Sequence, residues 1–446
     1  MTVCSIIQKM RKINIMEKEK MSYLKFTSAE LIAEKDKCCK ELQLFAEKNL
    51  SLDLSRGKPS KEQLELSLGM LDVINHNTLF DSESGMDCRN YGGLDGIPEA
   101  KQLMASVMNT HVDNVIIGGN SSLTLMYQLI SHAMTEGVCG CKPWYEIKDR
   151  KFLCPVPGYD RHFAITEHFG FELIPIPLNE DGPDMDLIEK YIADESVKGI
   201  WCVPKYQNPT GITFSDEVIK RFANLKPAAK DFRIFWDNAY CVHDFTDEYI
   251  TIPDIIEECS LAGNPDLVYE FSSTSKITFP GAGISAIATS PANLIDIKSF
   301  LKYATIGPDK MNQLMHARYF KNISGIKKHM KKHGDIMRPK FEAAYEILTK
   351  ELSGLDIASW TNATGGYFFS YITLPGCASK IVDMCKNAGV IFTPAGATHP
   401  KGFNKDDNDI RIAPSFATEQ EIASAIYILA LCTKIVSIDY LLENAK

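Results

Sequence analysis

The chain has 446 residues, of which 45% are hydrophobic and 24% charged, and this composition is typical of a globular protein with a large core and two or three domains. Its 48 basic and 57 acidic residues give a formal net charge of -9. No basic stripe with interleaved aromatic residues occurs, so we expect no nucleic-acid partner. Thirteen cysteines without a C-x-x-C pair favour reduced thiols in the cytoplasm over a disulfide framework or a metal site.

Two segments bear on membrane association. Residues 1–24 form a polar leader that need not be ordered, and they hold too few apolar residues for the core of a signal peptide. The most apolar segment, residues 423–436, is interrupted by Lys434 and is too short to span a bilayer. We therefore expect a cytoplasmic protein without a membrane partner.

The first ordered segment is predicted to be a helix. Thr27 and Glu30 form a capping box at its start, and apolar positions recur until about residue 50. Residues 52–59 then indicate a short strand followed by a glycine turn. Gly57 either serves only this turn or leaves room for a ligand through its missing side chain.

A strand, a glycine turn and the start of an apolar helix follow one another over residues 115–134. The turn contains Gly119, Asn120 and Ser121. Free backbone N–H groups and the helix dipole favour an anion at such a place, so this segment is a candidate phosphate site. An ordinary strand-to-helix turn is the alternative.

Strands and helices continue to alternate through the middle of the chain. This alternation predicts a mostly parallel sheet covered by helices on both faces. In such a sheet a ligand lies at the carboxyl ends of the strands, where Asn208, Asp237, Ser273 and Lys276 fall. The further strands are expected over residues 151–154, 171–176, 199–203, 232–236, 267–271 and 285–288.

Lys276 follows a buried strand and lies among hydroxyl and apolar residues. Loss of water would favour its neutral amine, which can form a Schiff base, although a solvated loop lysine is the alternative. Asp237 directly follows an apolar strand, where a carboxylate is costly unless a cation faces it. A helix cap or an internal salt bridge is its alternative. Tyr240 would share a face with Asp237 on one helical turn.

The pattern changes after residue 321 to long helices and a few short strands, expected at residues 365–369 and 409–413. Thr418 and Glu421 form a capping box at the last helix. We predict a large domain over residues 69–321. A smaller α+β domain would combine residues 25–68 with residues 322–446.

Four motifs occur in a fixed order: NPTG at residues 208–211, DNAY at 237–240, STSK at 273–276, and Arg411. Together they resemble the pyridoxal-phosphate aminotransferases of fold type I, over residues 52–416. The segment NYGGLDGIP at residues 90–98 and residues 272–283 are most similar to a subgroup of aspartate aminotransferases. The resemblance implies an α/β fold whose large domain has a mostly parallel, seven-stranded type of sheet.

The resemblance also implies a role for individual residues in catalysis. Lys276 would hold pyridoxal phosphate covalently and later move a proton, and Asp237 would keep the pyridine nitrogen protonated. Asn208 and Tyr240 would bind the phenolic oxygen. Tyr159 would stack on the ring, with a surface tyrosine as its alternative.

Binding roles follow in the same way. Arg411 would clamp the substrate α-carboxylate near Gly57 and Asn208. The phosphate would be held by Gly119, Asn120, Ser121 and Ser273, with Tyr91 reaching across from a second subunit, which implies a homodimer with active sites at its interface. One departure concerns the arginine that the family uses for the phosphate, because Ile284 stands at that position.

The implied reaction is ping-pong amino transfer between an L-amino acid, aspartate or glutamate first, and a 2-oxo acid. A preference for alanine, aromatic or 2-aminoadipate substrates, or a lyase on the same fold, is the alternative. A regulatory ligand-binding protein is less expected, because no helix-turn-helix head precedes the first helix. A nicotinamide site at residues 281–286 is discounted since no acidic residue follows at the required spacing. Candidates for reading a side-chain carboxylate are Arg89, Lys310 and Arg318.

Overall fold

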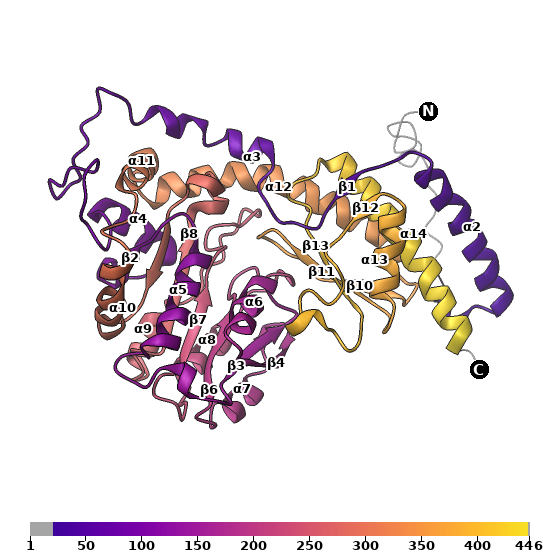
Figure 1. The fold of residues 1–446 in the computed structure, drawn as a ribbon. Coiled ribbons are helices and arrows are strands. Elements are labelled where there is room, and N and C mark those ends of the chain that lie inside the picture. The colour runs from indigo at the N-terminus through magenta and orange to yellow at the C-terminus, as the bar shows by residue number, and fades with distance from the viewer. Residues whose placement is uncertain (1–20, 445–446) are drawn as a thin grey trace.

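The computed structural model describes residues 21–444, which form two lobes joined along the long helix α12 (Ile323–Leu352). The larger lobe is built around a mixed β-sheet (Figure 1). The smaller lobe contains both ends of the described chain. Because α12 runs along both lobes, the domain boundaries placed at residues 68/69 and 321/322 remain predictions.

The central sheet has the strand order β2-β9-β8-β7-β6-β3-β4-β5. Strands β8, β7, β6, β3 and β4 are parallel, whereas β9 is antiparallel to both of its neighbours and β5 is antiparallel to β4. The predicted mostly parallel sheet is therefore confirmed, with the short strand β5 added at one edge. The strands are β2 (Val115–Ile117), β3 (Lys151–Val156), β4 (Glu172–Asn179), β5 (Gly182–Pro183), β6 (Val197–Cys202), β7 (Arg233–Asp237), β8 (Val268–Ser273) and β9 (Ser285–Ala288).

Both faces of this sheet are buried. On β7, Ile234 and Trp236 pack into one apolar cluster and Phe235 packs into a second cluster on the opposite face. A strand that is covered on both faces is apolar over most of its length, which explains the nearly continuous apolar runs of the sequence. The helices of this lobe are α4 (Pro98–Met108), α5 (Ser122–Thr135), α6 (Asp160–His168), α7 (Met185–Tyr191), α8 (Asp216–Ala223), α9 (Ile255–Leu261), α10 (Pro291–Ala304) and α11 (Lys310–Phe320).

The smaller lobe contains a three-stranded antiparallel sheet in the order β10-β11-β13. A second pairing joins the two ends of the chain, since β1 is parallel to β12. The strand expected at residues 365–369 begins only at Phe369, because Gly366 has a φ of +75° that extended strands do not allow. The elements are α2 (Ser28–Ala46), β1 (Leu52–Asp53), α3 (Lys61–Glu65), β10 (Ala358–Trp360), β11 (Phe369–Thr373), α13 (Ala378–Asn387), β12 (Val390–Ile391), β13 (Asp409–Ile412) and α14 (Glu419–Asn444).

The apolar segment around residues 423–436 belongs to a longer helix, α14, than the sequence suggested. This helix has 26 residues and is long and apolar enough to cross a membrane by length and composition. However, 72% of its most apolar window is buried inside the protein, where α14 packs against α2, α12 and α13. The predicted capping box is formed, because Thr418 N donates to Glu421 Oε2 at 2.8 Å and Glu421 N donates to Thr418 Oγ1 at 3.3 Å. We conclude that α14 is the core helix of the smaller lobe.

This packing can be tested by truncating one buried side chain of α14. Leu429 is fully buried in the core of the smaller lobe, so Leu429→Ala should lower the free energy of unfolding by about 2–5 kcal/mol. Leu44→Ala on the exposed face of α2 should change it by less than about 0.5 kcal/mol. Urea unfolding followed by circular dichroism measures both values, and equal effects would show that α14 is not a core helix.

Candidate active site

Polar side chains from both lobes meet at the carboxyl ends of β6, β7 and β8. Lys276 Nζ lies 4.8 Å from the centroid of the Tyr240 ring. Burial raises the pKa of Tyr159 to about 12, and the nearby Asp237 carboxylate adds to this rise while Arg411 opposes it. The same two charges act on the pKa of Tyr240, which burial raises well above its usual value. The structure thus brings together five residues that the sequence placed in one site.

Asp237 ends strand β7 and is buried. Its Oδ2 lies 3.0 Å from His162 Nε2, whereas its Oδ1 has no hydrogen-bond partner among residues 21–444. His162 stacks on Trp201 at a ring distance of 4.5 Å. One oxygen of a buried carboxylate is therefore held by the protein and the other is left for a ligand.

His162 was missed by the sequence analysis. It lies three residues after Tyr159, in the first turn of α6, and the two rings meet edge to face at 4.9 Å. This spacing was the available signal, because positions three residues apart share one side of a helical turn. Its partner Asp237 is 75 positions away in the sequence, so the contact itself could not be read from local pattern.

Lys276 ends a short 3₁₀ turn, Thr274–Lys276, that directly follows β8. The turn is tied to the next strand because Thr274 N donates to Ile284 O at 2.8 Å and Ile284 N donates to Thr274 Oγ1 at 2.9 Å. Burial lowers the pKa of the Lys276 amine, and the charge of Asp237 opposes this effect. Loss of water thus favours the neutral amine, which is the nucleophilic form.

Tyr240 does not lie on a helix, contrary to expectation. Asp237 is the last residue of β7, and Tyr240 lies in a turn closed by the hydrogen bond from His243 N to Tyr240 O at 3.1 Å. The two side chains meet because the chain turns sharply after the strand. Their proximity is therefore a property of this loop and not of helical periodicity.

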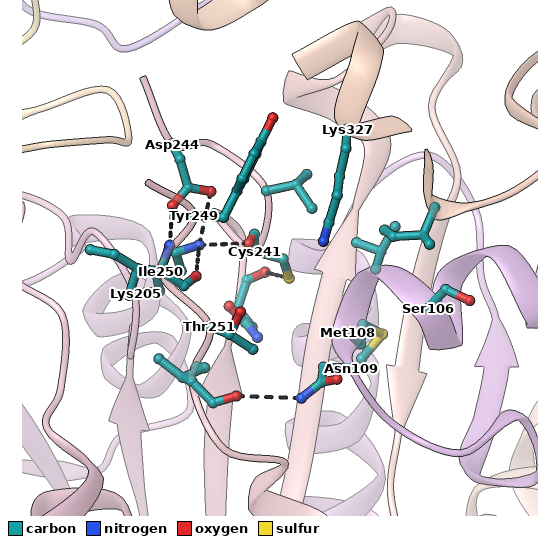
Figure 2. Close-up of a pocket in the computed structure, with 15 residues that line it drawn as sticks. Ser106, Met108, Asn109, Lys205, Cys241, Asp244, Tyr249, Ile250, Thr251 and Lys327 are labelled. Atoms are coloured by element: carbon teal, nitrogen blue, oxygen red, sulfur yellow. Dashed lines mark hydrogen bonds and ion pairs between the residues drawn. The ribbon is translucent and has the colours of Figure 1, made fainter. Parts of the chain in front are cut away.

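The buried ion pair between Lys205 and Asp244 binds the loop that carries Tyr240 (Figure 2). Lys205 Nζ binds Asp244 Oδ2 at 3.1 Å, Cys241 O at 2.8 Å and Ile250 O at 2.6 Å. Tyr206 OH donates to Asp244 Oδ1 at 2.6 Å. The pair lines a pocket of about 90 Å³, and burial lowers the pKa of Lys205 while Asp244 opposes this shift. The contacts connect the segment before Asn208 to the loop that carries Tyr240.

Arg411 comes from strand β13 of the smaller lobe and is buried. Its Nη1 lies 3.4 Å from Asn208 Oδ1 and 3.0 Å from Asp160 Oδ1. The Phe368 ring packs 5.1 Å from the guanidinium carbon. A Cβ atom at Gly57 would collide with this ring. The space that a Cβ atom at Gly57 would occupy is therefore taken by the Phe368 ring.

The residues predicted to hold the phosphate lie in the turn between β2 and α5 and at the end of β8. Ser285 N donates to Gly119 O at 2.7 Å, and Ser275 Oγ donates to Asn120 O at 2.7 Å. Ser121 precedes α5 without forming a side-chain cap. Thr124 N donates to Ser121 O at 3.2 Å, so the N–H groups of Ser122 and Leu123 are the ones suited to an anion. Ser273 ends β8 beside them. Ile284 is buried in the apolar core, so this position supplies no cation.

Four further residues that the sequence suggested for the site lie in the segment 81–92 or bind to it. The side chain of Tyr91 is 81% exposed. Arg89 Nη2 pairs with Asp87 Oδ2 at 2.8 Å, Lys310 Nζ donates to Gly92 O at 2.7 Å, and Arg318 Nη2 donates to Asp81 O at 3.4 Å. All three cations are thus bound to the segment 81–92, which also carries Tyr91.

Comparison with known proteins decides the family. A family model described as aspartate amino-transferase matches residues 26–445. The chain belongs to this family. A protein of Mycolicibacterium smegmatis that is named as an aminotransferase is 44% identical over 430 residues, which cover 95% of this chain and 100% of the relative.

Solved structures agree with this assignment. The crystal structure of an aspartate transaminase from Corynebacterium glutamicum matches with a TM-score of 0.92 and 41% identity, over 94% of this chain and 99% of that chain. LysN, an α-aminoadipate aminotransferase of Thermus thermophilus complexed with a phosphopyridoxyl-leucine, matches with a TM-score of 0.71 over 93% and 100% of the two chains. At 18% identity, LysN shows the fold alone. This aminotransferase is therefore a pyridoxal-phosphate-dependent enzyme of fold type I, as the resemblance implied.

The residues at the site fit pyridoxal phosphate. The unpartnered Oδ1 of Asp237 is an acceptor suited to a protonated ring nitrogen. The buried Lys276 amine is suited to an aldehyde. The uncapped start of α5 is suited to a phosphate group.

The role of the Lys205–Asp244 ion pair can be tested by measuring stability. Asp244→Ala would leave Lys205 buried without its counter-charge, so the free energy of unfolding should fall by about 3–5 kcal/mol. Asp247→Ala, which removes an exposed carboxylate 3.4 Å from Lys331 Nζ, should cost less than about 1 kcal/mol. Denaturant unfolding of both variants provides the comparison, and a small loss for Asp244→Ala would show that the pair does not support the loop.

Proposed function

We propose that this aminotransferase prefers aspartate or glutamate as the amino donor and passes the amino group to a 2-oxo acid. The proposal is supported by the Lys276 amine over the Tyr240 ring, by the Asp237 Oδ1 that has no partner among residues 21–444, and by Arg411 beside Asn208. The name of the related Corynebacterium glutamicum enzyme supports aspartate as the amino donor.

Pyridoxal phosphate supplies an aldehyde that captures amines and a ring that accepts electrons from the substrate carbon. Asp237 Oδ1 would accept the hydrogen bond of the ring nitrogen, and His162 would hold the carboxylate in that orientation through Oδ2. Tyr159 would cover the ring. Asn208 and Tyr240 would bind the phenolic oxygen, and Gly119, Asn120, Ser121 and Ser273 would hold the phosphate.

Lys276 has two roles in this proposal. Its Nζ would hold the cofactor until a substrate binds. Once a substrate amine has replaced it, the same Nζ would be free to remove the proton from the substrate Cα and to donate a proton back as the amino group is transferred. The lowered pKa of Lys276 suits both roles, because each requires an unprotonated amine.

Arg411 would bind the substrate α-carboxylate through two parallel N–H groups. A carboxylate held in this way is kept from leaving as carbon dioxide. The clamp therefore favours amino transfer over decarboxylation.

We further propose a homodimer in the cytoplasm. The exposed Tyr91 side chain supports a dimer, since it is free to reach the phosphate of a second subunit. Its segment would bring Arg89, Lys310 or Arg318 toward that site, where a cation could read a side-chain carboxylate. The free thiols of residues 21–444 suit a reducing compartment.

Lys276→Ala should abolish turnover and remove the visible absorbance band of the bound cofactor, because the covalent link is lost. Borohydride reduction followed by peptide mass spectrometry should label the wild-type peptide that contains Lys276 and leave the variant unlabelled. Lys302→Ala, at an exposed lysine beside Tyr303, is the control and should retain both band and label. Normal turnover of Lys276→Ala would reject the assignment.

Substrate preference is tested by half-reactions with aspartate, glutamate, alanine, phenylalanine and 2-aminoadipate. The absorbance of the bound cofactor should change fastest with aspartate or glutamate. Faster reaction with alanine or phenylalanine would contradict the proposed substrate and leave the assignment as an aminotransferase intact.

A further inference from the structure

Asp160 forms an ion pair with the guanidinium of Arg411, the group that the proposed function assigns to the substrate carboxylate. Its Oδ1 lies 3.0 Å from Arg411 Nη1. We propose that Asp160 is an internal competitor, which pairs with Arg411 and must release it before a substrate carboxylate can bind. The inference rests on the proposed clamp role of Arg411. Asp160 would then be a positioning residue that lowers the affinity for every carboxylate substrate.

The hydrogen bonds of Arg411 leave too few free donors for a substrate. A guanidinium has five N–H groups. Arg411 Nε donates to Thr393 Oγ1, Nη1 faces Asp160 and Asn208, and Nη2 donates to Ser55 O. These four bonds use four of the five N–H groups and leave one N–H on Nη2. A bidentate carboxylate needs two parallel N–H groups, so one existing bond must open.

Asp160 is the partner best able to leave. Its side chain is 38% exposed, against 8% for the Arg411 side chain, so its carboxylate can regain water. It also lies in the first turn of α6, where the helix dipole stabilises a negative charge after the ion pair opens. Asn208 and Thr393 are buried, and a carbonyl or hydroxyl group left there without a partner would be costly.

Charge also requires the exchange. If Asp160 stayed in place, its carboxylate and that of the substrate would share one guanidinium. Two negative charges so close together repel each other. Before a substrate binds, Asp160 gives the buried cation its counter-charge. A ligand without a carboxylate cannot make this exchange, so the pair also excludes simple amines from the position of the substrate.

Asp160→Asn tests the competition, because asparagine keeps a hydrogen-bond acceptor and removes the charge. Calorimetric titration of the cofactor-loaded protein with succinate, which has carboxylates and no amine, should show about two- to fivefold tighter binding than wild type. Asp160→Glu keeps the charge and should bind like wild type. Asp186→Asn, which removes an exposed partner of Arg221, is the matched control and should change nothing.

Kinetics give an independent result. If Asp160 competes with all substrates alike, Asp160→Asn should lower KM by the same factor for the amino acid and for the 2-oxo acid. Succinate binding that is equal to or weaker than wild type would overturn the competition and assign Asp160 to orienting Arg411 or to no role.

Arg411→Lys separates this inference from the proposed function. A lysine keeps the charge and loses the two-pronged contact, so succinate should bind more weakly. If Arg411→Lys binds as wild type does, the clamp assignment itself is wrong. If it weakens binding while Asp160→Asn does not strengthen it, the clamp stands and only the competition is rejected.

Discussion

A carboxylate buried at the end of strand β7 is the constraint around which the site is arranged. Taking an unpaired carboxylate out of water costs several kcal/mol, and the protein meets only part of this cost by pairing Asp237 Oδ2 with His162. The Trp201 ring stacks on the His162 ring and holds its orientation. Oδ1 has no hydrogen-bond partner among residues 21–444, and we propose that the ring nitrogen of the cofactor donates to it.

The second requirement is a cation from the other lobe. Arg411 lies on β13 of the three-stranded sheet, and the chain that follows β13 is bonded to the segment after β1, because Ala413 N donates to Leu54 O at 3.2 Å. Gly57 lets the Phe368 ring pack beneath the guanidinium. A site divided between two lobes leaves its arginine exposed to competition from any nearby acid, and Asp160 lies within reach.

Sequence reasoning found the residues that have short motifs and missed those that act through distant partners. Lys276, Asp237 and Asn208 follow strands whose apolar patterns are plain, so their place at one sheet edge could be predicted. His162 and Asp160 have no such motif, because their partners are 75 and 251 positions away. The Lys205–Asp244 pair was missed for the same reason. Tyr240 was placed on a helix wrongly, since a spacing of three residues fits a turn as well.

The amino-acid sequence by itself determined the alternating strands and helices, the helix caps at Thr27 and Thr418, and the family, because each depends on neighbouring residues or on ordered motifs. Only the tertiary structure decided which oxygen of Asp237 is free, which acid holds Arg411, and why α14 is a core helix. These properties depend on burial and on contacts between segments far apart in the chain. Burial sets the cost of each charge, and no local pattern records it.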